Sequence, residues 1–305
     1  KSSRLDEHMF FVGPLLILLA GDIHVNPGPT DGFCDTNICH INIRSLSEHK
    51  IRHIRTDIAS DFDMIALSET FLSNNTPDTH LTLPGFHNIM RRDRTSGAGG
   101  GVALYVSYNL VAIRRQDLEI PDIELLWSEI KLHNNTFLLG VVYRPPNSPV
   151  SFWDKLQDSF DLAKSTNIQN IILTGDLNSD SLTASGQKLH TFCVTNALVS
   201  HIREPTRITS ETSTCLDQII TNIPNYIKEP TVSPPIANCD HCVTSAKLLF
   251  RRKKESSYPR LIWQYNKADF DSFRDHLNQV NWENFFVSVD RKSTRLNSSH
   301  TVISY

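Results

Sequence analysis

The chain has 305 residues, a formal net charge of −3 and 39% hydrophobic residues, an ordinary composition for a globular protein with a substantial core. The charge balance excludes a strongly basic protein that would bind nucleic acid by net charge alone. It does not exclude a nucleic-acid enzyme that gathers carboxylates in a metal site. Of the six cysteines, only Cys239 and Cys242 are closely spaced, and no second pair completes a zinc site, so we interpret all six as reduced thiols.

The first 35 residues are predicted to lie outside the main domain. Their apolar run, Phe10 to Ala20, is eleven residues long, whereas a bilayer span needs about 20. The segment that follows, Gly21-Asp-Ile-His-Val-Asn-Pro-Gly-Pro29, resembles the ribosome-skipping (2A-like) peptides of viruses and some retrotransposons. The resemblance implies a break in the nascent chain between Gly28 and Pro29, with His24 standing where those peptides have Glu. A plain linker rich in proline and glycine is the alternative.

From residue 36 to 250, short apolar strands alternate with amphipathic helices. One predicted helix is capped by Ser47 and places Ile51, Ile54 and Ile58 on one face. Two more helices are predicted at 152–163 and 187–194. The predicted strands are 41–43, 64–67, 100–107, 125–132, 137–143, 171–173, 219–220 and 243–248. Two strand-rich halves with helices outside them predict one layered α/β domain.

Two further segments are predicted after this domain. Residues 251–289 form a connector whose basic start, Arg251 to Lys254, could contact phosphates but is interpreted as a solvated linker. Residues 290–305 look like the translation of a sequencing adapter. We therefore exclude them from the fold, and expect that the reading frame is truncated there.

Polar residues recur at the ends of the predicted strands. Alone, each has a structural explanation, such as a turn cap or a hydrogen-bonded core histidine. Together they suggest a site, because loops at strand ends converge on ligands without disturbing the core. The residues are Asn42, Glu69, Tyr143, Asp176 with Asn178, Asp217, and Asp240 with His241.

These residue types suit phosphodiester hydrolysis. A hard cation such as Mg²⁺ prefers carboxylate oxygens and keeps several waters, so Glu69 and one or two aspartates suffice. The attacking water needs a carboxylate or histidine base within hydrogen-bond reach. Negative charge that grows on the phosphate oxygens needs a metal, imidazole or amide donors.

The order and wording of the motifs resemble the endonuclease/exonuclease/phosphatase superfamily, and within it the apurinic-type endonucleases of non-LTR (LINE-like) retrotransposons. The motifs are Asn42, Ser68-Glu69-Thr70, Val142-Tyr-Arg-Pro-Pro146, Gly175-Asp-Leu-Asn178, Thr214-Cys-Leu-Asp217 and Asp240-His241, with Pro84-Gly-Phe86, Arg91 to Arg94, Gly99 to Tyr105 and Leu216 to Asn222 between them. The resemblance covers residues 38–250. It implies a four-layered α/β sandwich in which two packed mixed sheets are flanked by helices.

The same resemblance implies roles for single residues. Glu69 would be the principal ligand of Mg²⁺, with Mn²⁺ as the alternative ion, and Asn42 and Asp240 would complete the metal site. Asp176 would orient or deprotonate the attacking water. Asn178 would hold the phosphate and Tyr143 would support the phosphate site. His241 would contact the scissile phosphate, with its tautomer fixed by Asp217. Thr214 would steady its loop, and Arg144 and Asn147 would contact DNA or lie at the surface. Leu177, Thr214 and Cys239 depart mildly from the family's wording, and none of them removes an acid, a base or a ligand.

The resemblance further implies an enzyme that nicks double-stranded DNA and leaves a 3′-hydroxyl to prime reverse transcription. Its expected partners are the reverse transcriptase domain of the same polyprotein and the element RNA, and residues 263–270 resemble the connector that leads to that domain. We expect synthesis in the cytoplasm, action in the nucleus, no secretion and no membrane partner. Two alternatives stay open: a phosphatase or phosphodiesterase of the same superfamily, and a non-catalytic relic that only binds DNA.

Overall fold

The structure is a computed structural model that describes residues 24–26, 33–95, 97–132, 135–253, 260–262 and 269–282. The chain divides into two compact units. The larger unit is Asp31–Glu255, and the smaller one combines Lys1–Thr30 with Ser256–Tyr305. The predicted site residues all fall in the larger unit.

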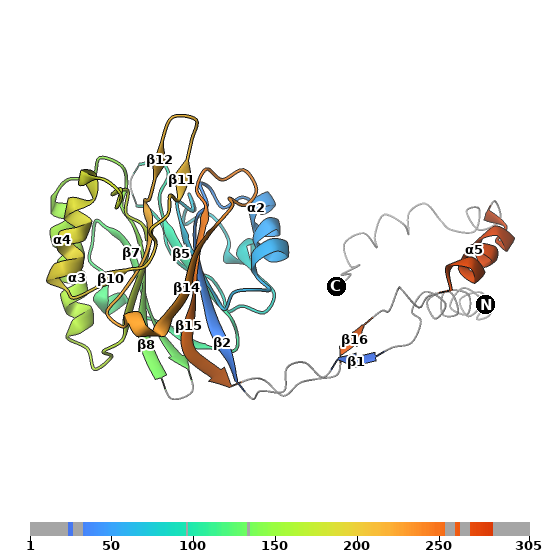
Figure 1. Ribbon diagram of the computed structural model, residues 1–305. Coiled ribbons are helices and arrows are strands. Elements are labelled where there is room, and N and C mark those ends of the chain that lie inside the picture. Colours follow the sequence, from blue (N-terminus) through green and yellow to red (C-terminus); the bar gives the residue numbers. More distant parts are fainter. Residues whose placement is uncertain are drawn as a thin grey trace. The chain divides into compact units, whose positions relative to one another are not determined.

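The larger unit is built on two six-stranded mixed sheets, which Figure 1 shows packed face to face. Strand order in the first sheet is β10-β13-β9-β8-β7-β6 and in the second β14-β15-β2-β3-β5-β4. The strands of the first sheet are β6 (Val111–Arg114), β7 (Glu124–Leu132), β8 (Asn135–Tyr143), β9 (Ile171–Asp176), β10 (Val199–Ser200) and β13 (Asp217–Thr221). Those of the second are β2 (Phe33–Asn42), β3 (Met64–Ser68), β4 (Met90–Arg92), β5 (Val102–Val106), β14 (Ile227–Ser233) and β15 (Val243–Lys253).

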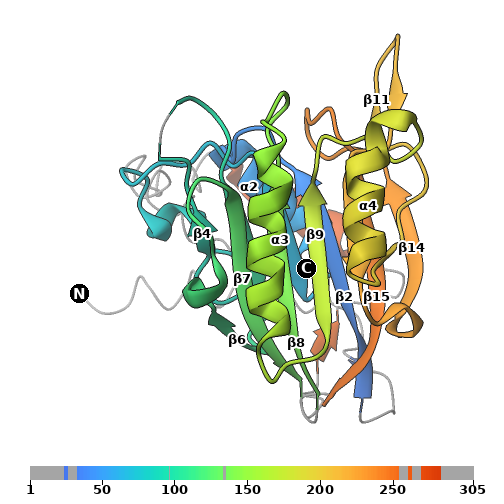
Figure 2. The same ribbon diagram turned by 90° about the vertical axis from the view of Figure 1, so that its left-hand side faces the viewer.

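Helices cover the outer face of each sheet. Helices α3 (Ser151–Lys164) and α4 (Gln187–Thr195) lie over the first sheet, as Figure 2 shows. Helix α2 (Glu48–His53), continued by the π-helical turn η1 (Ile54–Ile58), lies over the second. Single 3-10 turns lie at Asp78–Leu81, Gln116–Leu118, Ala184–Gly186 and Pro224–Tyr226. The predicted four-layered α/β sandwich is therefore confirmed.

Three hydrophobic cores separate the four layers, because successive side chains of a strand point to opposite faces. In β3, Met64 and Ala66 enter the core between the sheets, while Ile65 and Leu67 enter the core beneath α2. The third core lies between the first sheet and its two helices, around Trp127. Strands buried on both faces read as continuous apolar runs, which is why β3, β8 and β9 were easy to predict.

The predicted helices and strands are confirmed, with ends that differ by a few residues. The structure adds strands that the sequence did not reveal. These are short or lie at sheet edges, as β6 does, so they lack a long apolar run. The prediction that the basic segment Arg251 to Lys254 is a linker is partly wrong. Residues Arg251–Lys253 belong to β15, which pairs with the start of β2. The described cysteines at 39, 193, 215, 239 and 242 carry free thiols, as expected.

In the smaller unit, β1 (His24–Asn26) pairs antiparallel with β16 (Arg260–Ile262). Helix α5 (Phe270–Gln279) begins at Asp269, whose side chain accepts a hydrogen bond from the backbone N–H of Ser272. The predicted apolar run at 10–20, the adapter-like tail at 290–305 and most of the connector at 263–270 lie outside the described residues. Among the described helices, none combines the length and the apolar character of a membrane span.

Candidate active site

Strand topology brings the predicted polar residues to one edge of the two sheets. Strands β2 and β3 are parallel, with Asn42 opposite Ser68, and strands β8 and β9 are parallel, with Tyr143 opposite Asp176. The carboxyl ends of parallel strands lie at the same edge of a sheet, so each pair delivers its terminal residues together. Strand β13 runs antiparallel to β9 and starts at this edge, which places Asp217 opposite Asp176.

The buried amide of Asn42 joins the two sheets. Its Nδ2 donates to Glu69 Oε1 and to Asp176 Oδ2, each at 2.9 Å. The Tyr143 hydroxyl donates to the same Glu69 Oε1 at 2.9 Å. Burial, and then the Glu69 carboxylate, raise the pKa of Tyr143, so this hydroxyl keeps its proton and acts as a donor. Glu69 has a φ of 54°, a strained conformation that its neighbours must maintain.

Asp176 is fully buried and is held by the turn that follows it. The backbone N–H of Asn178 donates to Asp176 Oδ1 at 2.8 Å, and the Asn178 amide donates to Oδ2 at 3.2 Å. Asn178 has a φ of 42°, which asparagine tolerates better than most residues. Its amide also donates to the backbone carbonyl of Arg144 at 2.8 Å. The two predicted residues thus form one rigid turn.

Asp217 orients His241. Asp217 Oδ2 lies 2.8 Å from His241 Nδ1, and both side chains are buried. Burial opposes protonation of His241, but the Asp217 carboxylate outweighs it and raises the pKa of His241 to about 9. The Thr206 hydroxyl accepts hydrogen bonds from the backbone N–H groups of Leu216 and Asp217, which fixes the start of β13. The predicted Asp217–His241 pair is present.

Sequence reasoning missed a second buried histidine at this site. His40 Nδ1 lies 3.5 Å from Asp217 Oδ1, and its Nε2 lies 3.0 Å from Ser68 Oγ. Burial lowers the pKa of His40 to about 4, although Asp217 partly offsets it. The sequence could have indicated His40, because alternate residues of a strand point to the same face. Ile38, His40 and Asn42 therefore share the face of β2 that points to the other sheet.

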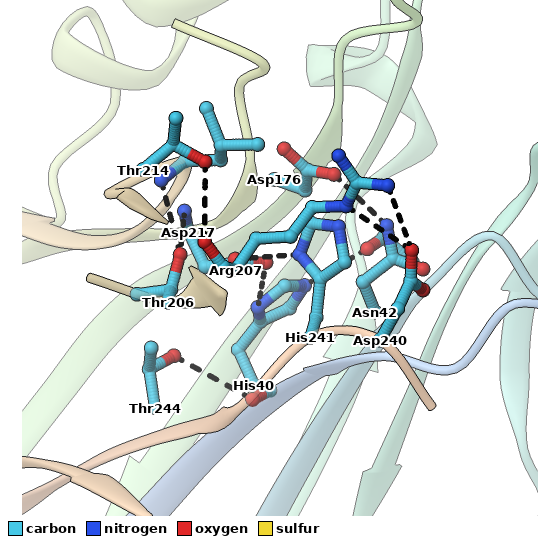
Figure 3. Close-up of polar contacts among 12 residues, drawn as sticks. His40, Asn42, Asp176, Thr206, Arg207, Thr214, Asp217, Asp240, His241 and Thr244 are labelled. Carbon is cyan, nitrogen blue, oxygen red and sulfur yellow. Dashed lines mark hydrogen bonds and ion pairs between the residues drawn. The ribbon is translucent and has the colours of Figure 1, made fainter. Parts of the chain in front are cut away.

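Asp240 is paired with two arginines, of which Figure 3 labels Arg207. Its Oδ2 accepts from Arg207 Nε at 3.1 Å and Nη2 at 3.0 Å, and lies 3.7 Å from Arg44 Nη1. Burial opposes ionisation of Asp240, but the hydrogen bonds from Arg207 lower its pKa below the usual value. A cation that used this oxygen would compete with two guanidinium groups, so the metal role of Asp240 stays a prediction without a contact that favours it.

Thr214 lies at the base of a hairpin made of β11 (Arg207–Ile208) and β12 (Ser213–Thr214). Its hydroxyl donates to the carbonyl of Arg207 at 3.4 Å, which fits the predicted role in steadying the loop. Arg207 also forms a β-bridge with His241. The hairpin is therefore anchored next to the imidazole.

Arg144 and Asn147 differ in their surroundings. The guanidinium of Arg144 donates to the backbone carbonyls of Asn178 at 3.1 Å and Ser148 at 3.1 Å. The same guanidinium lies over the aromatic rings of Phe152 and Trp153. These contacts indicate that Arg144 supports the Asp176–Asn178 turn. Asn147 is exposed with a φ of 60°, and its predicted contact with DNA stays a prediction.

The site has the donors that a divalent cation needs. Asp176, Asp217 and His241 each offer a ligand atom, and these atoms lie within 4.8 Å of one another. Burial and the neighbouring Asp217 raise the pKa of Asp176, a cost that a bound cation would relieve. Glu69 is not in this three-residue group, but the Asn42 amide links its Oε1 to Asp176. The hydrogen bonds from Asn42 and Tyr143 both use Oε1 of Glu69. Carboxylate and amide oxygens suit Mg²⁺ or Mn²⁺.

The chain is similar in fold to known nucleases and to a phosphatase. No curated protein sequence matches the chain significantly. Its structure is similar to the endonuclease domain of TRAS1, a telomere-specific non-LTR retrotransposon, with 13% identity, a TM-score of 0.58, and coverage of 73% of this chain and 100% of that one. It is also similar to the AP endonuclease LMAP from Leishmania major, with 12% identity, a TM-score of 0.59, and coverage of 76% of this chain and 94% of that one. A third similar structure is a variant of the 3′ phosphatase NExo from Neisseria, bound to a product DNA hairpin. Its identity is 15%, its TM-score is 0.50, and the match covers 70% of this chain and 99% of that one.

At these identities the structural likeness establishes the fold alone. The family model is more specific, because it matches residues 37–260, and this stretch contains the residues that form the Asn42, Asp176 and Asp217 hydrogen-bond system. The chain belongs to the endonuclease/exonuclease/phosphatase family.

Proposed function

We propose that this chain is the metal-dependent endonuclease of a non-LTR retrotransposon, which nicks target DNA and leaves a 3′-hydroxyl to prime reverse transcription. The observation that supports it most is the Asn42 amide, which holds Glu69 and Asp176 together across the two sheets. Asp217 lies opposite Asp176 and orients His241 beside them. This arrangement brings a carboxylate base, a cation-binding group and an imidazole to one place, as phosphodiester hydrolysis requires.

Asp176 is the residue that orients and deprotonates the attacking water. Its two oxygens accept hydrogen bonds from Asn42 and Asn178, which fix the direction of the carboxylate. Bound Mg²⁺, held by Glu69 with Asn42 and by the adjacent carboxylates, would supply Lewis-acid stabilisation of the phosphate.

His241 is the residue that contacts the scissile phosphate. Its Nδ1 is engaged by Asp217, so Nε2 is the nitrogen that remains for the substrate. With a pKa raised to about 9 the imidazole is positively charged at neutral pH and stabilises the negative charge that develops on phosphate oxygens. Asn178 and Tyr143 are proposed to support the phosphate from the same edge of the sheets.

The retrotransposon assignment is supported by the sequence phrases and by the fold. The phrases around Asn42, Arg91 to Arg94 and Leu216 to Asn222 resemble LINE-like endonucleases, and one of the similar folds is a retrotransposon endonuclease domain. The Neisseria phosphatase of the same fold binds a DNA hairpin, which supports DNA as the substrate. We propose further that the residues after β15, up to residue 289, connect to a reverse transcriptase that works with the element RNA in the nucleus.

A supercoiled-plasmid nicking assay on the full chain tests this function. We expect conversion to open circles with Mg²⁺ and none with EDTA. Asp176→Asn and His241→Gln should each lose at least about 1,000-fold in rate because they remove the base and the phosphate contact. Asp161→Asn, an exposed change on helix α3, is the matched control and should behave as wild type. A folded wild-type protein that leaves plasmid intact but hydrolyses inositol or lipid phosphates would replace the endonuclease with a phosphatase.

A further inference from the structure

We propose that His40 is a positioning residue, which with Ser68 fixes the second oxygen of Asp217 and thereby holds the His241 imidazole in place. His40 approaches Asp217 Oδ1 and His241 approaches Asp217 Oδ2, so His40 acts on the His241 imidazole through the carboxylate. The effect on catalysis rests on the proposed function. The effect on the His241 imidazole does not.

Four side chains form a continuous row across the site. Ser68 Oγ lies 3.0 Å from His40 Nε2, and His40 Nδ1 lies 3.5 Å from Asp217 Oδ1. The other oxygen of that carboxylate, Oδ2, lies 2.8 Å from His241 Nδ1. Figure 3 shows both imidazole rings next to the Asp217 carboxylate. One carboxylate is therefore shared by two histidines that come from β2 and from the segment before β15.

The direction of each hydrogen bond follows from the chemistry of the groups. An ionised carboxylate can only accept, so the nitrogens facing Asp217 on both histidines must carry protons. For a neutral His40, the proton on Nδ1 leaves Nε2 as an acceptor, and the Ser68 hydroxyl is the donor that fits it. The Asp217 carboxylate thus favours the tautomer of His40 that carries its proton on Nδ1, and the Ser68 hydroxyl, which can donate or accept, fits that tautomer as a donor.

Burial makes this contact important. His40 Nδ1 and Asp217 Oδ1 are both buried, and within the described part of the chain neither forms a hydrogen bond, the 3.5 Å contact between them included. A buried polar atom left unpaired destabilises the fold, so each atom is the natural partner of the other. At 3.5 Å the contact is longer than an ordinary hydrogen bond. Such contacts often tighten only when substrate binds.

The row also ties the imidazole to the metal-binding side of the site. Ser68 is the last residue of β3 and immediately precedes Glu69. It is also opposite Asn42 in the parallel ladder between β2 and β3. A shift of β3 would therefore move Glu69 and, through Ser68 and His40, the Asp217–His241 pair. This geometry gives the chain a physical reason to keep serine and histidine at these two positions.

Nuclear magnetic resonance of the full chain in EDTA, without DNA, tests the positioning role directly. The probe is the proton on His241 Nδ1, identified by its disappearance in His241→Gln. In His40→Leu, which has no donor, we expect this proton to shift and to exchange faster with water. In His40→Asn, whose amide can donate near the position of Nδ1, the resonance should stay close to that of the wild type. His87→Leu, a change at a histidine bonded to the carbonyl of Leu110, is the matched control.

Kinetics provide the second readout. With Mg²⁺ and plasmid, His40→Leu should lower kcat by about 10- to 100-fold with little change in KM, and His40→Asn should recover most of the loss. If His40→Leu does not fold, Ser68→Ala replaces it and should change the His241 resonance in the same direction. An unchanged resonance in the leucine or alanine variant, or equal loss in His40→Asn and His40→Leu, would overturn the proposal. A changed resonance in a protein that never nicks DNA would leave the positioning role intact and refute the endonuclease.

Discussion

Asp176 and Asp217 lie directly opposite each other on the adjacent antiparallel strands β9 and β13, and both side chains are fully buried. Like charges in this position destabilise a sheet. The fold offsets the repulsion with donors on both sides: Asn42 and Asn178 on Asp176, and His241 on Asp217. The site therefore carries electrostatic strain that a divalent cation would relieve.

Metal binding should consequently raise thermal stability. We predict that saturating Mg²⁺ raises the Tm of the wild-type protein, because a ligand at 100 times its Kd adds about 2.7 kcal/mol to the free energy of unfolding. Glu69→Gln should remove most of this shift, since it weakens a carboxylate ligand. Glu211→Gln, an exposed change in the β11–β12 hairpin, should keep it. Differential scanning calorimetry with Mg²⁺ and with EDTA measures the shift, and an equal shift in all three proteins would contradict the assignment.

The His241–Asp217 pair predicts a pH dependence of stability. The pKa of His241 is raised from 6.5 to about 9 in the folded state, so its contribution to stability is complete below about pH 6.5 and is lost as pH rises through 9. We predict that the wild type exceeds His241→Gln in unfolding free energy at pH 6, and that this difference shrinks by roughly 1–3 kcal/mol at pH 9.5. Urea denaturation in EDTA measures it, with the exposed His190→Gln as control. A difference that stays constant with pH would count against the charged pair.

Substitution of Arg144 tests whether this residue has a structural role or a role in DNA binding. Because its guanidinium donates to carbonyls of the Asp176–Asn178 turn, we predict that Arg144→Ala lowers the free energy of unfolding by about 1–3 kcal/mol and lowers kcat. If Arg144 only supports the turn and contacts no phosphate, the salt dependence of DNA binding should not change. A shallower salt slope with unchanged stability would instead restore the DNA contact that the sequence suggested.

Gly175 sets the backbone that leads into Asp176. Its φ is +149°, and an added Cβ would lie 1.8 Å from the carbonyl oxygen of Val142. We therefore expect Gly175→Ala to cost at least about 3 kcal/mol of stability. Gly97, with a φ of +82° and no atom within 4 Å of its added Cβ, is the matched control and should cost only about 1 kcal/mol as alanine. Similar losses in the two variants would mean that backbone conformation, and not the close approach to Val142, decides the effect.

The interior of the fold was predictable because buried strands and amphipathic helices have clear apolar patterns. Strand β3 is apolar throughout except for its last residue, Ser68, and the helix after Ser47 shows its isoleucine stripe, with the Ser47 side chain accepting from the backbone N–H of Lys50. Strand β6 was missed because it lies at a sheet edge and alternates between exposed and half-buried positions. Edge strands gain most of their pairing from tertiary context, which local sequence does not record.

The site residues were predictable in kind but not in their partners. Motif wording identified Asp176, Asp217 and His241, and strand topology explains why they meet. The pairing of Asp240 with Arg207 depends on how the β11–β12 hairpin folds back, so no local sequence pattern predicts it. His40 was overlooked because its neighbour Asp217 lies on the other sheet. A single histidine in an apolar strand is also as often a hydrogen-bonded core residue as a functional one.

The chemistry of the nick tests the central claim most directly. A plasmid nicked by the wild-type chain with Mg²⁺ is purified and given to a DNA polymerase with labelled nucleotides, without prior phosphatase treatment. We predict immediate extension from the nick, because hydrolysis that leaves a 3′-hydroxyl produces a ready primer, and no extension with Asp176→Asn. Nicks that are extended only after removal of a 3′-phosphate, or an intact plasmid from a folded protein, would contradict the account.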